Sequence, residues 1–371
     1  MDYEQFKEEV KATIKDYLPE KYEDAEINIV QVTKNNDQKL DGLTIRSKDS
    51  SVTPTIYING MFDRMQNGEK MSDIMREIAD LHLNHENAVG IDVSKILDYE
   101  KAKENITCRL VNAEQNAEYL KDKPYTQIED LAITYHIKVN DGPEGLMTSP
   151  ITDKLMKQYG VTKDDIHKVA MENLERLTPP KFVSMQEMMM EIMLPDKSDP
   201  NYDIMKQALT EQIGGADNLM YVLTNENKVN GAVLALDQNI MDKIAEKVGG
   251  DFYVLPSSVH EVLVVPKRAD MDVKDLEHMV QEVNATQVAV EEQLSDHVYM
   301  YDAKEHEFLR ADKAEARAQK SPEHESTNME QGCMSMDGWS AGIEKQKSAQ
   351  NKVTPAHERS ADRSKNMGGR D

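Results

Sequence analysis

One short segment of the sequence carries side chains of the kinds that nucleophilic and acid–base catalysis require. In order, its residues are Pro256, Ser257, Ser258, Val259, His260 and Glu261, and apolar runs flank them. Either serine could act as the nucleophile, with His260 as its base and Glu261 orienting the imidazole. A plain hairpin uses the same residues, because proline sets a turn and serine hydroxyls bind its backbone. Neighbouring strand side chains point to opposite faces, so His260 and Glu261 diverge unless a bulge turns one of them. The hairpin interpretation is therefore favoured.

Two polar positions further along the chain are candidate supporting residues for this turn. Asn284 closes a helical segment, and Asp296 lies in the stretch that leads into the last apolar run. Together with His297 and Tyr299, Asp296 could join a polar cluster around His260 in the folded chain. Helix capping and turn formation explain Asn284 and Asp296 equally well.

Metal and cofactor chemistry finds little support in the sequence. His82 and His85 are three residues apart on a predicted helix and could hold a metal with Glu86, but closed zinc sites need three or four ligands. Histidine also suits a helix end. The sequence contains no GxxxxGK[ST], GxGxxG, GxSxG or HExxH motif. We therefore expect no metal and no cofactor.

A methionine-rich helix is predicted after Ser184, and it has two interpretations. Met185, Met189 and Met193 recur every four residues, which is the spacing of a packed helix face. Thioether sulfurs also bind Cu(I), but no cysteine or histidine lies beside them. Core packing, or an adaptable partner-binding helix, is the favoured interpretation.

The charge balance excludes some classes of partner. The chain carries a formal net charge of −24, and its last 52 residues contain eight basic and eight acidic side chains. The acidity therefore belongs to residues 1–319, which should repel nucleic acids and anionic membranes. Solubility is the simple explanation of this charge, and mimicry of DNA by the acidic surface is the more specific one. Cys108 and Cys333 lie far apart, and no signal peptide or apolar span is recognisable, so we expect a cytoplasmic protein.

Hydrophobic periodicity predicts an α+β fold of mixed helices and mostly antiparallel hairpins, arranged in two lobes. Residues 1–215 form the first lobe, which ends in helices, and residues 216–312 form a compact ββαββαββ lobe. Residues 313–371 have almost no aliphatic content from about residue 320 onward, so a disordered tail is predicted. Trp339 is the only tryptophan and lies in this tail, where it is a candidate partner-binding residue.

Three longer stretches of the chain resemble a known family. They are PSSVHEVLVVP, MVQEVN and LSDHVYMYD, supported by TPTIYINGMFDRMQNGEKMSDIMREI and DLAITYHIKV. In these the chain resembles the domain-of-unknown-function family 5688, found in gut Clostridia, over roughly residues 1–310. The resemblance implies a bacterial cytoplasmic setting and a link to mobile elements, but no reaction. It marks as motif positions Pro256, Ser257, Ser258, His260, Glu261, Asn284 and Asp296.

These observations lead to two functional hypotheses. The first is a non-catalytic interaction or regulatory protein, whose acidic body and tail with Trp339 engage a protein partner. The alternative is a small-substrate hydrolase that uses Ser257 or Ser258 with His260 and Glu261.

Overall fold

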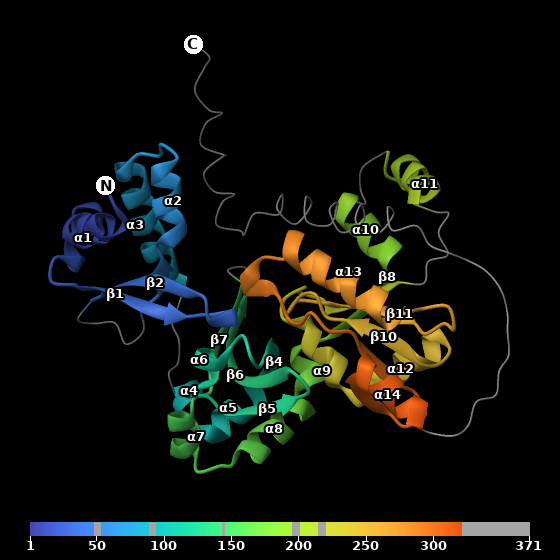
Figure 1. Cartoon of the computed structure of the whole chain (residues 1–371). Coiled ribbons are helices and arrows are strands. Elements are labelled where there is room, and N and C mark those ends of the chain that lie inside the picture. The colour runs from blue at the N-terminus through green and yellow to red at the C-terminus, as the bar shows by residue number, and fades with distance from the viewer. Residues whose placement is uncertain (48–52, 89–93, 143–144, 195–200, 214–219, 321–371) are drawn as a thin grey trace.

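The computed structural model describes residues 1–47, 53–88, 94–142, 145–194, 201–213 and 220–320. The fold is α+β with antiparallel sheets, as the sequence predicts. Figure 1 shows three groups of elements: an N-terminal lobe, a four-stranded sheet below it, and a six-stranded sheet with its helices beside both.

The N-terminal lobe packs three helices onto one face of a small sheet with the order β1-β2-β3. Phe6 and Val10 of the first helix, Leu43 of the sheet, and Ile74 and Ile78 of the third helix are buried together. On both helices the buried residues are four positions apart, which is the spacing of an amphipathic helix face. The elements are α1 (Tyr3–Thr13), β1 (Glu26–Thr33), β2 (Lys39–Arg46), β3 (Thr55–Tyr57), α2 (Asn59–Gln66) and α3 (Met71–Ala88).

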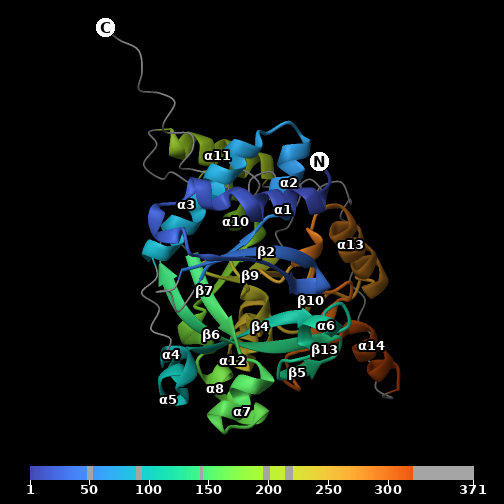
Figure 2. The same cartoon turned by 90° about the vertical axis from the view of Figure 1, so that its left-hand side faces the viewer.

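The second group is a four-stranded antiparallel sheet in which the long strand β6 pairs β4 along one edge and β5 and β7 along the other. Figure 2 shows it below the N-terminal lobe. One face packs on α8, and Tyr135, Ile137 and Ile166 are buried there. The elements are α4 (Ser94–Leu97), α5 (Tyr99–Ala102), β4 (Ile106–Asn112), α6 (Ala117–Leu120), β5 (Tyr125–Ile128), β6 (Leu131–Gly142), β7 (Gly145–Pro150), α7 (Asp153–Tyr159), α8 (Lys163–Glu172) and α9 (Leu174–Leu177).

The third group is a six-stranded sheet with the order β13-β12-β10-β11-β9-β8. Alternate residues of its central strands serve two cores: Val254 and Val264 face the four-stranded sheet, while Leu255 and Val265 face α13. The elements are β8 (Pro180–Ser184), α10 (Met185–Met193), α11 (Tyr202–Ile213), β9 (Tyr221–Asn225), the 3₁₀ helix η5 (Gly231–Leu236), α12 (Gln238–Val248), β10 (Phe252–Leu255), β11 (Val262–Pro266), α13 (Val273–Thr286), β12 (Tyr299–Asp302), β13 (Glu307–Arg310) and α14 (Ala311–Lys320).

Three details differ from the sequence-based expectation. Residues 232–236, expected as the second strand of a ββαββαββ lobe, belong to the 3₁₀ helix η5, because burial on all sides removes the alternation that marks a strand. Strand β8 precedes residue 215, yet it pairs with β9, so the C-terminal sheet extends across the expected lobe boundary. Helix α14 runs beyond residue 313, because Ala311 and Ala314 are buried in the core under α13.

A hydrogen-bonded asparagine joins the N-terminal lobe to the start of α6 and to the loop after α13. Asn36 lies in the turn between β1 and β2, with a φ of 55°, and is only 7% exposed. Its Nδ2 donates to the carbonyl oxygens of Val290 (2.6 Å) and Gln293 (2.8 Å). Its backbone N–H donates to Asn116 Oδ1 (2.8 Å), and Asn116 Nδ2 donates back to Asn36 Oδ1 (2.8 Å). The turn that enters β2 is therefore fixed to the rest of the chain by polar contacts.

Asn36→Ala should destabilise this joint by at least about 2 kcal/mol, because it leaves buried carbonyl and amide groups unsatisfied and loses a residue that tolerates positive φ. Denaturant unfolding measures the change, and hydrogen exchange at 34–38 and 290–293 locates it. Asn28→Ala, at an exposed position of β1, is the control and should change stability by less than about 0.5 kcal/mol. An Asn36 variant as stable as this control would contradict the role of the joint.

Candidate functional site

The 256–261 segment is the connection between β10 and β11, which pair as antiparallel neighbours with Leu255 opposite Leu263. Ser258 is buried, with 6% of its surface exposed, and its Oγ accepts a hydrogen bond from the backbone N–H of His260 at 3.0 Å. Its backbone also forms a β-bridge with Gln293. A serine hydroxyl that stabilises its own turn is the arrangement that the hairpin interpretation predicts.

The ring of His260 has two defined neighbours. Its Nδ1 lies 3.1 Å from the backbone N–H of Asn230 and accepts that hydrogen bond, which places the proton of the neutral ring on Nε2. Nε2 lies 3.5 Å from Glu292 Oε1. The carboxylate beside the imidazole is therefore that of Glu292, in a loop remote in sequence, rather than that of Glu261. The His260 side chain is 26% exposed and that of Glu292 is 43% exposed.

The carbonyl of His260 is held as tightly as its ring. It accepts hydrogen bonds from the backbone N–H of Gly231 at 2.9 Å and from Thr224 Oγ1 at 2.8 Å. A Cβ added to Gly231 would lie 2.7 Å from the His260 carbonyl oxygen and 2.8 Å from the backbone nitrogen of Asn225. Glycine is required here because two backbones approach each other too closely for a side chain.

Asn284 and Asp296 are bonded to each other, in the segment that contacts the turn. Asn284 is 3% exposed, and its Nδ2 donates to the Ser295 carbonyl (3.0 Å) and to Asp296 Oδ1 (2.7 Å). The backbone N–H of Ser295 in turn donates to the Pro256 carbonyl at 3.1 Å. These bonds hold the loop after α13 between that helix and the 256–261 turn.

His297 and Tyr299, which could have joined a cluster with His260, contact other residues. His297 Nδ1 lies 3.4 Å from Glu277 Oε1. The hydroxyl of Tyr299 donates to Asp130 Oδ1, and Ser295 Oγ donates to Asp130 Oδ2 at 2.7 Å. Burial, reinforced by the Asp130 carboxylate, raises the pKa of Tyr299 far above its ordinary value.

Asp130 and Asn36 are structurally important residues that sequence reasoning did not single out. Asp130 lies in the turn before β6 and connects the four-stranded sheet to Ser295 and Tyr299 of the C-terminal lobe. The only sequence signal for it was its place at the start of the stretch DLAITYHIKV in the family resemblance. The Asn35–Asn36 pair is typical of a turn, but no local pattern marks the bonds of Asn36, because its partners come from distant segments.

The structure describes only some of the remaining candidate residues. His82 is 2% exposed, and its ring meets that of Tyr22 edge-on at 5.0 Å. The side chain of His85 and the whole of Trp339 lie outside the described residues. Among the residues that the structure describes, no group of three or more His, Cys, Asp or Glu side chains is arranged to hold a metal ion. Burial raises the pKa of the Cys108 thiol to about 12.

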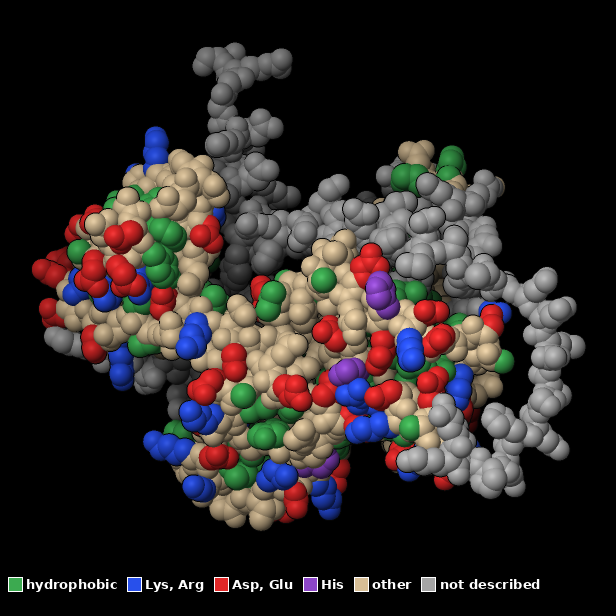
Figure 3. All heavy atoms as spheres, in the orientation of Figure 1, with side chains coloured by type: hydrophobic (Ala, Val, Ile, Leu, Met, Phe, Trp, Pro, Cys, Tyr) green, Lys and Arg blue, Asp and Glu red, His purple; other side chains and the backbone are tan. Residues whose placement is uncertain are grey.

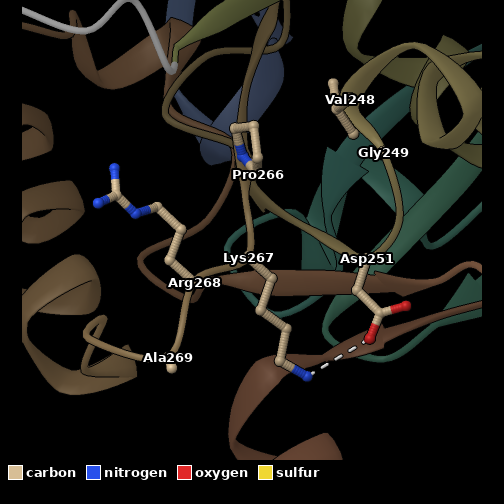
Figure 4. A pocket seen from close by; sticks show the side chains of 7 residues that line it. All are labelled: Val248, Gly249, Asp251, Pro266, Lys267, Arg268 and Ala269. Carbon is tan, nitrogen blue, oxygen red and sulfur yellow. Dashed lines mark ion pairs between the residues drawn. The ribbon is translucent and has the colours of Figure 1, made fainter. Parts of the chain in front are cut away.

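A shallow cavity of about 370 Å³ lies at the other end of the β10–β11 hairpin, away from the 256–261 turn. It is lined by Val248, Gly249, Asp251, Pro266, Lys267, Arg268 and Ala269. Lys267 Nζ lies 3.5 Å from Asp251 Oδ2 across it, as Figure 4 shows, while the Arg268 side chain extends away from this pair. Arg268 Nε lies 3.4 Å from Asp270 Oδ1, so both cations of the cavity have a carboxylate neighbour.

Gly231→Ala should destabilise the protein by about 1–3 kcal/mol, because the new methyl group forces the backbones of residues 231 and 260 apart. Gly60→Ala is the matched control, since a Cβ at Gly60 in α2 would meet no atom within 4 Å. The control should stabilise the protein by about 0.5–1 kcal/mol, because alanine is the better helix former. Denaturant unfolding of both variants checks the prediction, and effects of the same sign would contradict it.

Comparison with known proteins agrees with the family resemblance and does not assign chemistry to the site. No curated protein and no solved structure matches the chain. None of the described helices is long and apolar enough to cross a membrane. The sequence model described as "Family of unknown function (DUF5688)" matches residues 3–303, which include all the motif positions of the turn and its surroundings. The chain therefore belongs to this family of unknown function.

Proposed function

We propose that this chain is a non-catalytic protein-interaction protein of a bacterial cytoplasm. The observation that carries the proposal is an exposed apolar surface on α10 and α11. Met193 of α10 is 44% exposed, and Ile204 and Met205 of α11 are 70% and 39% exposed. We call these three residues the arm surface. They lie on two helices that contact each other at the margin of the molecule, where a partner could cover them.

The arm surface lies apart from the cores of the lobes. In Figure 1, α10 and α11 lie above the six-stranded sheet, and Figure 3 shows hydrophobic side chains on α11. Met188, on the inner side of α10, is 2% exposed and belongs to the core under α13. The methionine-rich helix therefore has a packed face and an exposed end, and flexible methionine side chains adapt well to an apolar partner surface.

The charge of the body favours one class of partner. With a net charge of −24, the protein attracts basic segments and repels nucleic acids and anionic membranes. Acidic side chains are prominent on the N-terminal lobe in Figure 3. We therefore propose a partner segment with apolar anchors and basic flanks, such as a basic amphipathic helix. Trp339, outside the described residues, is proposed as a second contact with the same partner.

The chemistry of the 256–261 turn supports the non-catalytic proposal over the hydrolase alternative. Ser258 Oγ, both ring nitrogens of His260 and Asn284 Nδ2 have neighbours that hold loops in place, whereas Asn284 Oδ1 is buried without a partner among the described residues. A nucleophile must donate its hydroxyl proton to a base, and among the described residues Ser258 Oγ only accepts a hydrogen bond, from the backbone N–H of residue 260, and makes none with the His260 ring. The hydrolase hypothesis stays a prediction. Its direct test is whether His260→Asn abolishes a hydrolase activity of the unmodified protein.

A double variant, Ile204→Ser with Met205→Ser, tests the arm surface. Quantitative affinity purification of the tagged full-length chain from its host should recover a specific partner. The double variant should lose most of that recovery, because both apolar anchors are removed. Val30→Ser is the matched control, since Val30 is 49% exposed on the N-terminal lobe, and it should retain the partner. Equal recovery with the double variant and the control would contradict the proposal.

A further inference from the structure

The face of the four-stranded sheet that points away from the α8 side carries a polar group that the proposed function does not use. In the sheet register Arg109 lies opposite Thr134, Thr107 opposite His136, and Lys138 opposite Thr148. Alternation along strands places Arg109, Thr134, His136 and Thr148 on one face, opposite to the face of Cys108 and Tyr135 in the core. Three strands therefore contribute to one polar group.

Arg109 has an unusual environment for a cation in so acidic a protein. Its Nη2 donates to Thr148 Oγ1 at 2.6 Å, and in the part of the chain that the structure describes no carboxylate pairs with the guanidinium. Burial lowers the pKa of Arg109 from its ordinary value. The Nε and Nη1 groups have no partner among the described residues and are not sealed from solvent. A partly buried charge without a counterion is costly, so the site favours an anion.

His136 supplies a second observation that points to a ligand. It is 3% exposed; its Nε2 lies 3.1 Å from Thr134 Oγ1, and its Nδ1 has no hydrogen-bond partner among the described residues. Burial, and after it the charges of Arg109 and Lys123, hold the pKa of His136 well below its ordinary value. Buried polar atoms are nearly always hydrogen-bonded, and an orphan atom often marks the place where another group binds.

The neighbouring lysine does not share the role of Arg109. Lys123 Nζ donates to Asp122 Oδ1 at 2.7 Å and to the Tyr119 carbonyl at 2.7 Å, and it lies 4.3 Å from the centroid of the Tyr119 ring. Its charge is therefore compensated within the protein. Of the two cations whose charges bear on His136, only Arg109 has no carboxylate partner among the described residues.

We propose that Arg109 and His136 form a binding site for the carboxylate group of a small molecule. The planar guanidinium fork matches a carboxylate, and the unpaired charge of Arg109 suits a monoanion better than a phosphate dianion in a body of this acidity. Thr134 Oγ1 makes only a long contact, 3.4 Å, with the Arg109 carbonyl. Its hydroxyl can turn to donate to His136 Nε2, which moves the imidazole proton to Nδ1, where it can be donated to the carboxylate.

The unmodified full-length protein gives the first test. Acetate and succinate are titrated against chloride at constant ionic strength, and ¹⁵N NMR follows the imidazole nitrogens, with His136→Asn identifying the resonance. A saturable shift of the His136 signal is expected at millimolar concentrations, about 1–10 mM, because the probes have few atoms. A His136 signal that does not respond, or responds equally to chloride, would overturn the proposal.

Arg109→Gln tests the cation, and Arg76→Gln is its control because Arg76 is an exposed arginine paired with Asp73 on α3. Loss of the charge-assisted pair should weaken acetate binding at least about tenfold, whereas the control should bind as the wild type does. Thr148→Val removes the hydroxyl that accepts from Arg109 and orients it. This variant is the second test if Arg109→Gln fails to fold, and it should weaken acetate binding several-fold. Unchanged binding in either folded variant, or tighter binding of inorganic phosphate than of acetate, would refute a carboxylate site.

Discussion

The hydrogen bonds of Asn36 are the constraint on which the arrangement of the molecule depends. A turn between two strands of the N-terminal lobe offers few apolar atoms for docking, so the turn is fixed through hydrogen bonds of its polar groups. Asn36 is suited to this because its amide both donates and accepts, and because asparagine tolerates a positive φ. Next to it, Asp37 accepts the backbone N–H groups of Glu118 (3.0 Å) and Tyr119 (2.8 Å) at the start of α6. One turn thereby contacts α6 and the loop that follows α13.

The same loop connects this joint to the candidate turn. Gln293 receives a hydrogen bond from Asn36 at its carbonyl, forms a β-bridge with Ser258, and donates through its side chain to the Asn284 carbonyl at 2.9 Å. Ser258 and Asn284 thus share a structural role, because they bind the backbone of a long connection that has no sheet of its own to pair with. The Oδ1 atom of Asn284 is an exception, since it is buried without a hydrogen-bond partner among the described residues.

Local sequence patterns specify local structure in this chain. Thr162 with Asp165 and Ser184 with Glu187 both form capping boxes, because the interaction lies within one helical turn. Gly249 ends α12 with a φ of 90°, as a glycine after a periodic run indicates. Asn36 could not be recognised, because its partners are 80 and 254 residues away. The same holds for Glu292 beside His260, where the carboxylate expected from sequence was the adjacent Glu261.

Helices α10 and α11 leave and re-enter the sheet between two strands that pair directly, with Ser184 opposite Tyr221. Adjacent strands lie about 5 Å apart, so both ends of this excursion meet at nearly the same point. The exposed side of α11 and the end of α10 can change without moving any strand of the sheet, as in an inserted domain, whereas Met188 of α10 is packed in the core under α13. Substitutions on the exposed side should therefore cost little of the stability that the remaining fold provides.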